Sequence, residues 1–448
     1  MPTKKPTTPV TSLAVPSSRL GRLMRLGGMA TSVAGNMLVA GAQQFVQGKR
    51  PKISDLLLTP ANALKVTQQL SQMRGAAMKV GQLISMDAGD LLPPEMAAVL
   101  ARLRSDAHSM PERQLRAVLT ANWGAQWQNR FASFSFAPIA AASIGQVHRA
   151  TTQDGRDLAI KVQYPGVRKS ISSDVNNVAS LLRLSGLLPK TLDIAPLLLL
   201  AKRQLREEAD YEAEGAHLQR FAQLLANAPE FVVPALHADL TTKNVLAMSF
   251  EAGVPVESLA DAPQAERDRL VSLLVGLLFR ELFEFGLMQT DPNFANYRYD
   301  PLSQQLILLD FGATRRVTPA FSQAYQQLIR ATLAGDRDAM AQAGRMIGYF
   351  DEKTQAKHQM AVLELFEIAL EPLLFEGSFD FGRTDMAPRL REAGLALGLD
   401  QDFWHIPPID ALFLPRKLGG LFLLAAQLRA RVNVRELALP YLRPDSLH

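Results

Sequence analysis

The chain has 448 residues and therefore room for roughly two or three domains, each with its own hydrophobic core. Hydrophobic residues make up 48% of it and charged residues 20%, which is typical of a globular protein. It contains no cysteine, which excludes disulfide bonds, thiolate metal sites and a catalytic thiol.

The net charge is only +5, but basic residues are concentrated near the N-terminus. No Asp or Glu precedes Asp55, whereas eight Lys and Arg residues do. We expect this segment to bind an anionic membrane surface. Nucleic acid is a poorer partner, because Phe45 is the only aromatic residue in the segment and no base-stacking pattern is present. An organelle-targeting peptide and a solvated tail are the alternatives.

Four regions follow one another along the chain. Residues 1–18, rich in Pro, Thr and Ser, are predicted to be a disordered tail. Residues 19–130 are predicted to form a helical extension, which starts with an amphipathic helix over residues 19–47 and is interrupted at Leu92-Pro93-Pro94. Residues 131–252 are predicted to form a small lobe of strands and helices, and residues 253–448 are predicted to form a larger helical lobe.

The small lobe carries the β-rich runs, and Gln153-Asp154-Gly155 between two of them predicts a hairpin turn. A helical pattern follows over residues 174–188 and again over residues 196–225. The large lobe adds one strand pair around residues 297–310. No transmembrane helix is predicted, because the apolar stretches are interrupted by charges or too short. The strands of the small lobe are expected at Phe134–Phe136, Gln146–Ala150, Asp157–Gln163 and Val245–Phe250.

One candidate for phosphate binding is Lys161, at the end of the apolar run Leu158-Ala159-Ile160. A lysine on a strand can direct its ammonium group off the sheet to a phosphate, but taken alone it is more simply a strand lysine that reaches solvent. It needs a carboxylate partner on a following helix, and residues 207–214 offer several.

A candidate metal ligand is Asp310, which follows the apolar run 306–309 and begins Asp310-Phe311-Gly312. A kinase-type fold presents a Mg²⁺ ligand at such a strand end. The same tripeptide recurs at residues 380–382, but no apolar strand precedes it there, and we interpret that copy as a loop.

A third motif, Asp291 followed by Asn296, has the Asp-x₄-Asn spacing of a kinase catalytic loop. In that loop the Asp faces the attacking group and the Asn binds metal, so Asn296 and Asp310 would provide oxygen ligands for Mg²⁺. Gln289 and Thr290 replace the usual His-Arg. Each motif alone is weak, but their order along the chain makes them strong together.

The loop before the lysine strand differs from that of ordinary kinases. In place of a glycine-rich turn it has Ala140-Ala141-Ala142-Ser143 before Gly145. Three β-carbons restrict the backbone and keep it farther from a phosphate. The alternative is a buried alanine run, which its position before Lys161 makes less attractive.

Together these residues resemble the UbiB family of atypical kinases and ATPases, over roughly residues 20–439. The similarity also includes Lys79-Val80-Gly81-Gln82, an element that ordinary kinases lack, and Glu208-Ala209-Asp210. It implies a two-lobed, α+β, protein-kinase-like fold with the N-terminal helical extension packed over the active site.

The resemblance also implies roles for individual residues. Lys79 and Gln82 would belong to a regulatory element that occludes the site, with Glu208 and Asp210 facing it. Glu214 would pair with Lys161, and adenine would lie near Met248. ATP or ADP and Mg²⁺ are the implied ligands.

The resemblance implies a Mg²⁺-dependent ATPase or small-molecule kinase that supports ubiquinone biosynthesis. After Asp310-Phe311-Gly312 a helical pattern begins by about Pro319, with no Ala-Pro-Glu and no long activation segment, which argues against peptide phosphorylation. A nucleotide-gated scaffold with little turnover and a true protein kinase are the alternatives.

The expected partners are an anionic membrane surface, isoprenoid or quinone lipid intermediates, proteins of ubiquinone biosynthesis and a second copy of the chain as a homodimer. Nucleic acid is not expected. About twenty residues precede the similar region, which is short for a mitochondrial presequence. The predicted location is therefore the bacterial cytoplasm, peripheral at the inner membrane, with the matrix side of the mitochondrial inner membrane as the alternative.

Overall fold

The computed structural model describes Leu70, Met73 and residues 75–81, 110–142, 144–184, 194–399 and 407–442. The predicted tail over residues 1–18, the amphipathic helix over residues 19–47, the helix break at Leu92-Pro93-Pro94 and the candidate residues Gln82 and Ser143 lie outside these residues. The described residues form two compact units. The first runs to Gly215 and includes Leu236–Phe250; the second comprises Ala216–Ala235 and the chain from Glu251 onward.

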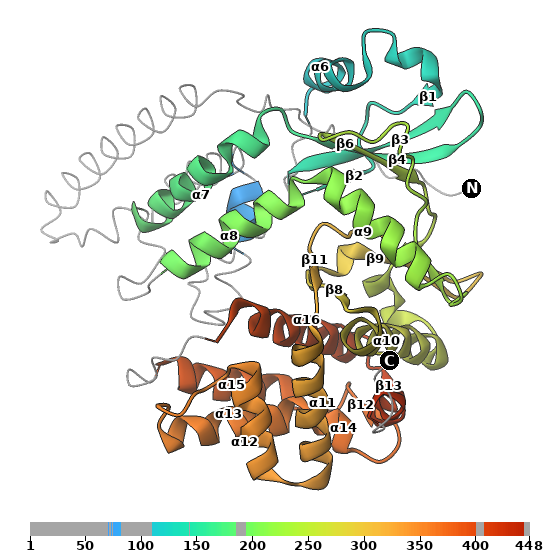
Figure 1. The fold of residues 1–448 in the computed structure, drawn as a ribbon. Coiled ribbons are helices and arrows are strands. Elements are labelled where there is room, and N and C mark those ends of the chain that lie inside the picture. Colours follow the sequence, from blue (N-terminus) through green and yellow to red (C-terminus); the bar gives the residue numbers. More distant parts are fainter. Residues whose placement is uncertain are drawn as a thin grey trace, which may run out of the picture. The chain divides into compact units, whose positions relative to one another are not determined.

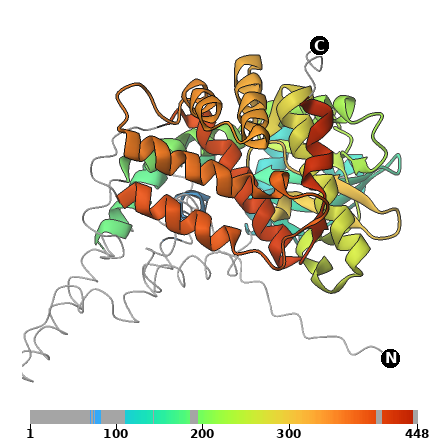
Figure 2. The ribbon, with the colours of Figure 1, turned by 90° about the horizontal axis from the view of Figure 1, so that it is seen from below.

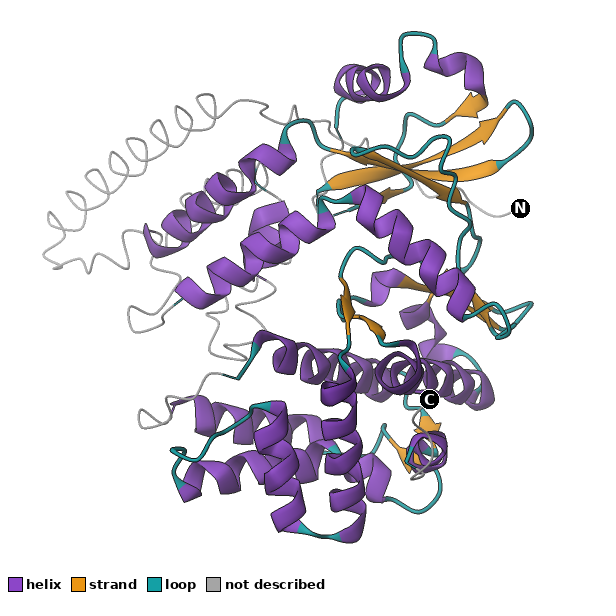
Figure 3. Ribbon diagram, viewed as in Figure 1, coloured by secondary structure: helices purple, strands orange, loops and turns teal. Residues whose placement is uncertain are grey.

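The first unit is built on an antiparallel five-stranded sheet (Figures 1 and 3). Its central strand β4 has an unbroken buried run from Leu158 to Gln163, so both of its faces are covered. Gly155, with φ of +87°, makes the predicted hairpin turn between β3 and β4. The strands are β1 (Phe131–Phe134), β2 (Ala140–Ala141), β3 (Gly145–Thr152), β4 (Asp157–Gln163) and β6 (Val245–Ser249), and the strand order is β1-β3-β4-β6 with β2 pairing β3.

Helix α6 (Glu112–Trp123) and the 3-10 turn Trp127–Arg130 share one core with this sheet. The rings of Trp123 and Trp127 lie 5.3 and 6.0 Å from that of Phe131. The Trp123 Nε1–H donates to the carbonyl oxygen of Leu240 at 2.8 Å, so the polar edge of the ring is satisfied within the core. The expected boundary between residues 130 and 131 thus falls inside a packed unit.

Two helices replace the single one expected over residues 196–225: α8 (Ala195–Glu208) and α9 (Tyr211–Leu224). The continuous prediction was wrong, because Asp210 starts a new helix. Its side chain accepts from the amide of Ala213 at 3.2 Å, and its carbonyl accepts from Glu214 at 2.9 Å. The preceding helix is α7 (Val167–Leu184).

The second unit contains a four-stranded sheet, in which the apolar strand β10 lies between β5 and β9. A separate two-stranded ribbon joins β8 to β11, with Gln289 opposite Thr314 and Leu287 opposite Arg316. The strands are β5 (Phe231–Val232), β7 (Val254–Pro255), β8 (Leu287–Gln289), β9 (Tyr297–Asp300), β10 (Gln305–Leu308) and β11 (Thr314–Arg316).

Helices make up the rest of the second unit, and Figure 2 shows several of its C-terminal helices side by side. Thr318 and Asp336 cap two of them through bonds to backbone amides. The helices are α10 (Gln264–Arg280), a π-helical turn (Glu281–Phe285), α11 (Pro319–Ala334), α12 (Arg337–Ile347), α13 (Ala356–Ala369), α14 (Glu371–Leu374), α15 (Met386–Leu399), α16 (Ile409–Gln427) and α17 (Val434–Ala438).

Short 3-10 turns and a two-stranded ribbon complete the element list. The turns are Val256–Asp261, Phe294–Asn296 and Leu439–Tyr441, and the ribbon pairs β12 (Phe379–Asp380) with β13 (Arg431–Val432). Within the described part of the chain, no helix combines the length and the hydropathy needed to cross a bilayer.

Candidate active site

Lys161 lies in the middle of β4, opposite Val147 of β3 and Leu246 of β6. Its Nζ donates to both carboxylate oxygens of Glu214, at 2.8 and 3.2 Å. Glu214 belongs to the first turn of α9 and is only 1% exposed. The ion pair that the family resemblance implied is therefore formed within the first unit.

This buried pair orients the lysine more than it stabilises the fold. Desolvation of two charges offsets most of their attraction, whereas removal of one partner leaves an uncompensated charge. The Lys161 Nζ also lies 5.3 Å from the centre of the Tyr211 ring, on the same helix as Glu214. The ammonium group is thus held at a defined place beside the sheet, as a phosphate ligand must be.

A second buried lysine of the first unit pairs in the same way. Lys79, on the short helical segment 75–81, lies 2.5 Å from Glu208 at the end of α8. Their side chains are 6% and 14% exposed. Asp210 caps α9 and lies 3.8 Å from Arg168, and its expected contact with the same element stays a prediction.

Gln163 belongs to the stretch after Lys161 that resembles the family, but the sequence assigned it no role. It is 2% exposed, and its Nε2 donates to the carbonyl oxygen of Ala209 at 2.8 Å. Ala209 separates Glu208 from Asp210, so this bond fixes the end of β4 to the junction of α8 and α9. The two helices that carry Glu208 and Glu214 are thereby attached to the strand that carries Lys161.

The alanine-rich loop is a tight hairpin on the edge of the sheet. Ala140 and Ala141 form β2, opposite Val147 and Gln146, and both are exposed. The amide of Ala142, which is half-buried, donates to the carbonyl oxygen of Gly145 at 3.0 Å. The exposure of Ala140 and Ala141 excludes the alternative of a buried alanine run.

Gly145 is required for packing. A Cβ at this position would lie 2.3 Å from the carbonyl oxygen of Val162 and 3.0 Å from the Tyr211 hydroxyl. The remaining nucleotide candidate of this unit, Met248, is 6% exposed and pairs with Ala159 across β4 and β6. Its expected contact with adenine stays a prediction.

The second unit contains Asp291 and Asn296, which follow β8. The Asn296 amide nitrogen points to the carbonyl oxygen of Asp291 at 3.5 Å, a long contact. The carbonyl oxygen of Asn296 accepts from the amide of Leu309 at 2.9 Å. That bond connects the Asp-x₄-Asn loop directly to the residue before Asp310.

Asp310 follows β10, and its Oδ1 accepts from the amide of Gly312 at 3.0 Å. Phe311 is 1% exposed, and its ring centre lies 4.9 Å from that of Phe221. A buried aromatic ring thus anchors the turn that presents Asp310.

The second Asp-Phe-Gly makes the same local turn, with Asp380 accepting from Gly382 at 3.0 Å. It is not the loop expected from the sequence, because Asp380 belongs to the short strand β12. Arg431 donates to its carboxylate at 3.1 Å. This copy is therefore a structural element whose charge is neutralised by arginine.

Tyr297 lies near three carboxylates of the second unit. Burial raises the pKa of the Tyr297 hydroxyl well above its usual value, and the carboxylates of Glu281, Asp291 and Asp310 raise that pKa further. A divalent cation would offset the negative charge of Asp291 and Asp310, whereas that of Glu281 is offset by Lys417.

A buried ion pair holds the strand that leads to Asp291. Lys417 of α16 donates to the carboxylate of Glu281 and, at 2.8 Å, to the carbonyl oxygen of Gln289. The amide of Gln289 donates back to Glu281 at 3.3 Å. Glu281 and Lys417 are 1% and 6% exposed. We call these three residues the Gln289 clamp.

Burial raises the pKa of Glu281 and lowers the pKa of Lys417, while each charge opposes the shift of the other. Helix α16 also approaches the loop closely at Gly420, where a Cβ would lie 2.7 Å from the Cβ of Pro292. Pro292 directly follows Asp291, so α16 supports the loop on both sides of the carboxylate.

Comparison with known proteins identifies the family. The model of the ABC1 atypical kinase-like domain matches residues 102–344. Atypical kinase COQ8B, mitochondrial, of Rattus norvegicus is 38% identical over 425 residues, covering 94% of this chain and 80% of the rat protein. The chain belongs to the UbiB family of ABC1 atypical kinases. The family resemblance seen in the sequence is thus confirmed.

A second relative and one solved structure are also similar to this chain. Atypical kinase COQ8, mitochondrial, of Saccharomyces cerevisiae is 35% identical over 430 residues, covering 95% of this chain and 85% of the yeast protein. The Rv3197–erythromycin complex from Mycobacterium tuberculosis has a TM-score of 0.58 and 25% identity, covering 87% of this chain and 98% of that one. The α+β kinase-like fold and the kinase or ATPase class of enzyme are confirmed.

The polar groups of this UbiB protein fit a magnesium ion. Mg²⁺ is commonly bound by one or two protein carboxylates together with substrate phosphates. Asp310 supplies a carboxylate, and the side-chain amide of Asn296, 7% exposed, supplies an oxygen when its nitrogen faces Asp291. Over the described residues no cluster of three or more Asp, Glu or His suggests a different metal site.

Proposed function

We propose that this UbiB-family protein is a Mg²⁺-dependent ATPase or small-molecule kinase that supports ubiquinone biosynthesis at a membrane surface. The observation that carries the proposal is the buried ion pair between Lys161 and Glu214, because it holds a phosphate-binding ammonium group in place without ligand. The intact set of Asp291, Asn296 and Asp310 supports turnover over a binding function alone.

Each side chain has a task in this proposal. Lys161 orients the α- and β-phosphates of ATP, and Glu214 holds Lys161. Asn296 and Asp310 bind Mg²⁺, which when bound neutralises charge that develops on the phosphates. Asp291 positions the acceptor hydroxyl or water and takes up its proton as the acceptor oxygen bonds to the γ-phosphorus and ADP leaves. Positioning and charge neutralisation supply most of the rate.

The short connection after Asp310 favours a small acceptor or water over a peptide. Only β11 and two further residues separate Ala313 from the start of α11 at Pro319. A protein kinase uses a longer segment there to dock its substrate. Transfer of phosphate from ATP to a protein in trans would contradict this part of the proposal.

Ubiquinone biosynthesis is proposed from the relatives named COQ8 and COQ8B. Their names also contain the word mitochondrial, which supports the mitochondrial inner membrane over the bacterial membrane expected from the sequence; the bacterial location stays a prediction. The proposed membrane partner is an anionic lipid surface, bound through the basic N-terminal residues. Isoprenoid or quinone intermediates, ubiquinone-biosynthesis proteins and a homodimer stay proposals.

The deciding experiment measures Mg²⁺-dependent phosphate release from ATP by wild type and Asp310→Asn, with and without anionic liposomes. We expect release that increases with liposomes and is lost in the variant. Loss of biological function in Asp310→Asn without measurable wild-type hydrolysis, while nucleotide still binds, would favour the scaffold. Deletion of residues 1–52 should weaken liposome binding, most clearly at low salt. Equal partitioning of both proteins would refute the membrane role of that segment.

A further inference from the structure

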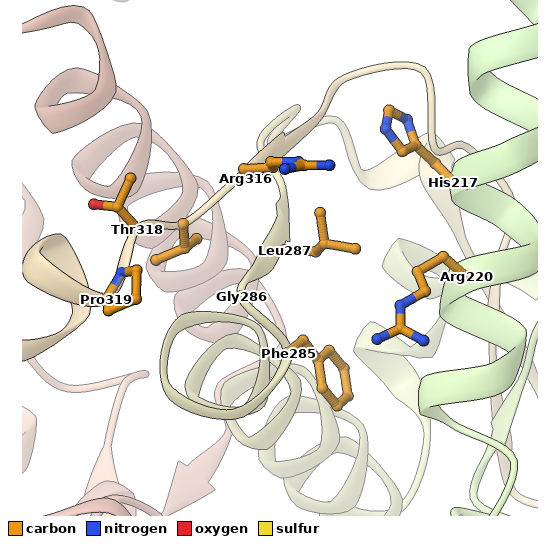
Figure 4. Close-up of a pocket in the computed structure, with 9 residues that line it drawn as sticks. His217, Arg220, Phe285, Gly286, Leu287, Arg316, Thr318 and Pro319 are labelled. Atoms are coloured by element: carbon orange, nitrogen blue, oxygen red, sulfur yellow. The ribbon is translucent and has the colours of Figure 1, made fainter. Parts of the chain in front are cut away.

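A cavity of about 560 Å³ lies within the second unit, apart from the residues assigned to ATP and Mg²⁺ (Figure 4). Its walls come from α9, the end of the π-helical turn, the ribbon of β8 and β11, and the start of α11. It is lined by His217, Arg220, Phe285, Gly286, Leu287, Arg316, Val317, Thr318 and Pro319. A volume of this order accommodates a small organic ligand.

The cavity is basic and has no acidic lining residue. Arg220 from α9 and Arg316 from β11 both project into the space between α9 and the ribbon, Arg220 toward Phe285 and Arg316 toward His217 (Figure 4). Neither forms an ion pair with any residue that the structure describes, and Arg220 donates only to the side chain of Gln223, at 3.3 Å. Elsewhere in the unit Arg337 makes two bonds to Glu367, at 2.7 and 2.8 Å.

Two unpaired guanidinium groups that line one cavity favour an anion that can accept several hydrogen bonds. Phosphate meets that requirement, since arginine binds it through paired N–H donors. The nearest carboxylate in sequence, Glu284, is bound by Arg280 at 3.1 and 3.2 Å and is not a lining residue. Its charge is therefore already compensated.

The rest of the lining is apolar. Phe285 is buried, with its ring edge-on to Phe221, and Leu287, Val317 and Pro319 continue the apolar wall. A free inorganic anion would leave this wall in contact with water. A ligand that carries a phosphate group on an apolar body would cover it and gain hydrophobic stabilisation.

The cavity is connected to the loop that holds Asp291 through the β8–β11 ribbon. Arg316 lies opposite Leu287 and Thr314 lies opposite Gln289. One residue past this pair, the amide and the hydroxyl of Thr290 both donate to the carbonyl oxygen of Ala313, at 3.0 and 2.7 Å. Because Asp291 follows Thr290 directly, a ligand that moves or fixes the ribbon acts on the loop that holds Asp291.

We propose that this cavity is a regulatory site for a phosphate group carried on an apolar body, and that occupancy changes turnover through the β8–β11 ribbon. The binding half stands on the cavity alone, whereas the regulatory half rests on the proposed ATPase or kinase function.

The binding test uses the full chain with saturating ADP, so that the nucleotide site is filled. Calorimetry compares hexyl phosphate, hexanol and inorganic phosphate. We expect saturable binding of hexyl phosphate only, and an affinity lowered about tenfold or more by Arg220→Ala or Arg316→Ala, each of which removes a charge-assisted contact. Arg383→Ala, at a side chain 82% exposed and outside the cavity, is the matched control and should bind normally. Unchanged affinity in both cavity variants, or equally tight binding of inorganic phosphate, would overturn the proposal.

The source of the ligand is decided by vesicles of phosphatidylcholine with and without phosphatidic acid. If the cavity variants lose binding to the acidic vesicles, the phosphate belongs to a lipid headgroup; if they lose only hexyl phosphate, it belongs to a smaller soluble amphiphile. Either result supports the shared chemistry. For the regulatory half, hexyl phosphate should change wild-type ATP turnover at least about twofold and leave Arg316→Ala unaffected. Binding without any change in measurable turnover would overturn regulation, whereas absence of turnover with intact binding would count against the proposed function alone.

Discussion

The Gln289 clamp allows a sharp test of how the loop around Asp291 is held. In Lys417→Met the apolar side chain replaces most of the volume but leaves Glu281 buried without its partner. Removal of one member of a buried ion pair typically lowers the free energy of unfolding by about 3–5 kcal/mol. The carbonyl oxygen of Gln289 loses its 2.8 Å bond at the same time. We therefore expect strong destabilisation and a large decrease in ATP turnover.

The double variant Glu281→Leu/Lys417→Met separates stability from positioning. It removes both charges, so the penalty of an isolated buried charge disappears and only the backbone groups of Gln289 lose partners. An unsatisfied buried group costs about 1–3 kcal/mol, so the double variant should be more stable than Lys417→Met. ATP turnover should stay low, because the amide and the carbonyl oxygen of Gln289 both lose the side chains that hold them near Asp291.

Chemical denaturation measures the free energies of unfolding, and phosphate release at saturating ATP measures kcat. Nucleotide affinity, measured separately, serves as the control, because Lys161 and Glu214 belong to the first unit and are unchanged. We expect kcat to decrease in the double variant with little change in ADP affinity. A double variant that is folded and turns over ATP like wild type would refute the positioning role of the clamp.

Three further outcomes are expected. Glu214→Ala should lower the free energy of unfolding by about 3–5 kcal/mol and abolish turnover, since it removes one member of the buried ion pair with Lys161. Denaturation measures the stability and phosphate release the turnover, and retained turnover would contradict the assigned role. Gly145→Ala should lower the free energy of unfolding by about 1–3 kcal/mol, because the new Cβ meets the backbone of Val162. The control Gly276→Ala, at a helical position with no atom within 4 Å, should stabilise the protein. Equal shifts in Tm for the two variants would refute this. Burial lowers the pKa of His148 in the folded protein, so the unfolded protein takes up a proton on this residue first as pH falls. The free energy of unfolding should therefore decrease by at most about 1.4 kcal/mol per pH unit below about pH 6.5. An unchanged pH dependence of stability in His148→Gln would exclude this residue as the cause.

Local patterns were sufficient wherever a feature depends on neighbouring residues. The strand Asp157–Gln163 was predicted with its observed bounds, and the turn at Gly155 and the helix start at Pro319 were also found. Such features follow from β-propensity, from the positive φ that glycine allows and from the fixed φ of proline. The spacing of Asp291 and Asn296 is likewise local and could be read directly.

The break between α8 and α9 was missed although its signal is also local. Asp210 has the side chain of a good N-cap, but the surrounding Glu and Ala residues continue a helical pattern through it. Hydrophobic periodicity correctly predicted helical structure over residues 196–225 but did not show the boundary between α8 and α9. The consequence matters for the site, because Glu208 and Glu214 belong to different helices.

The sequence by itself determined the family motifs, the lysine strand, the Asp-x₄-Asn loop and the apolar strand before Asp310, because each is encoded within a few consecutive residues. Tertiary structure alone decided which charge the buried Lys417 meets. Lys417 lies in the apolar helix α16 and pairs with Glu281, 136 residues away in the chain. Hydrophobic periodicity places such a lysine in an apolar helix, but its burial and the partner that makes burial of its charge tolerable depend on packing between distant segments.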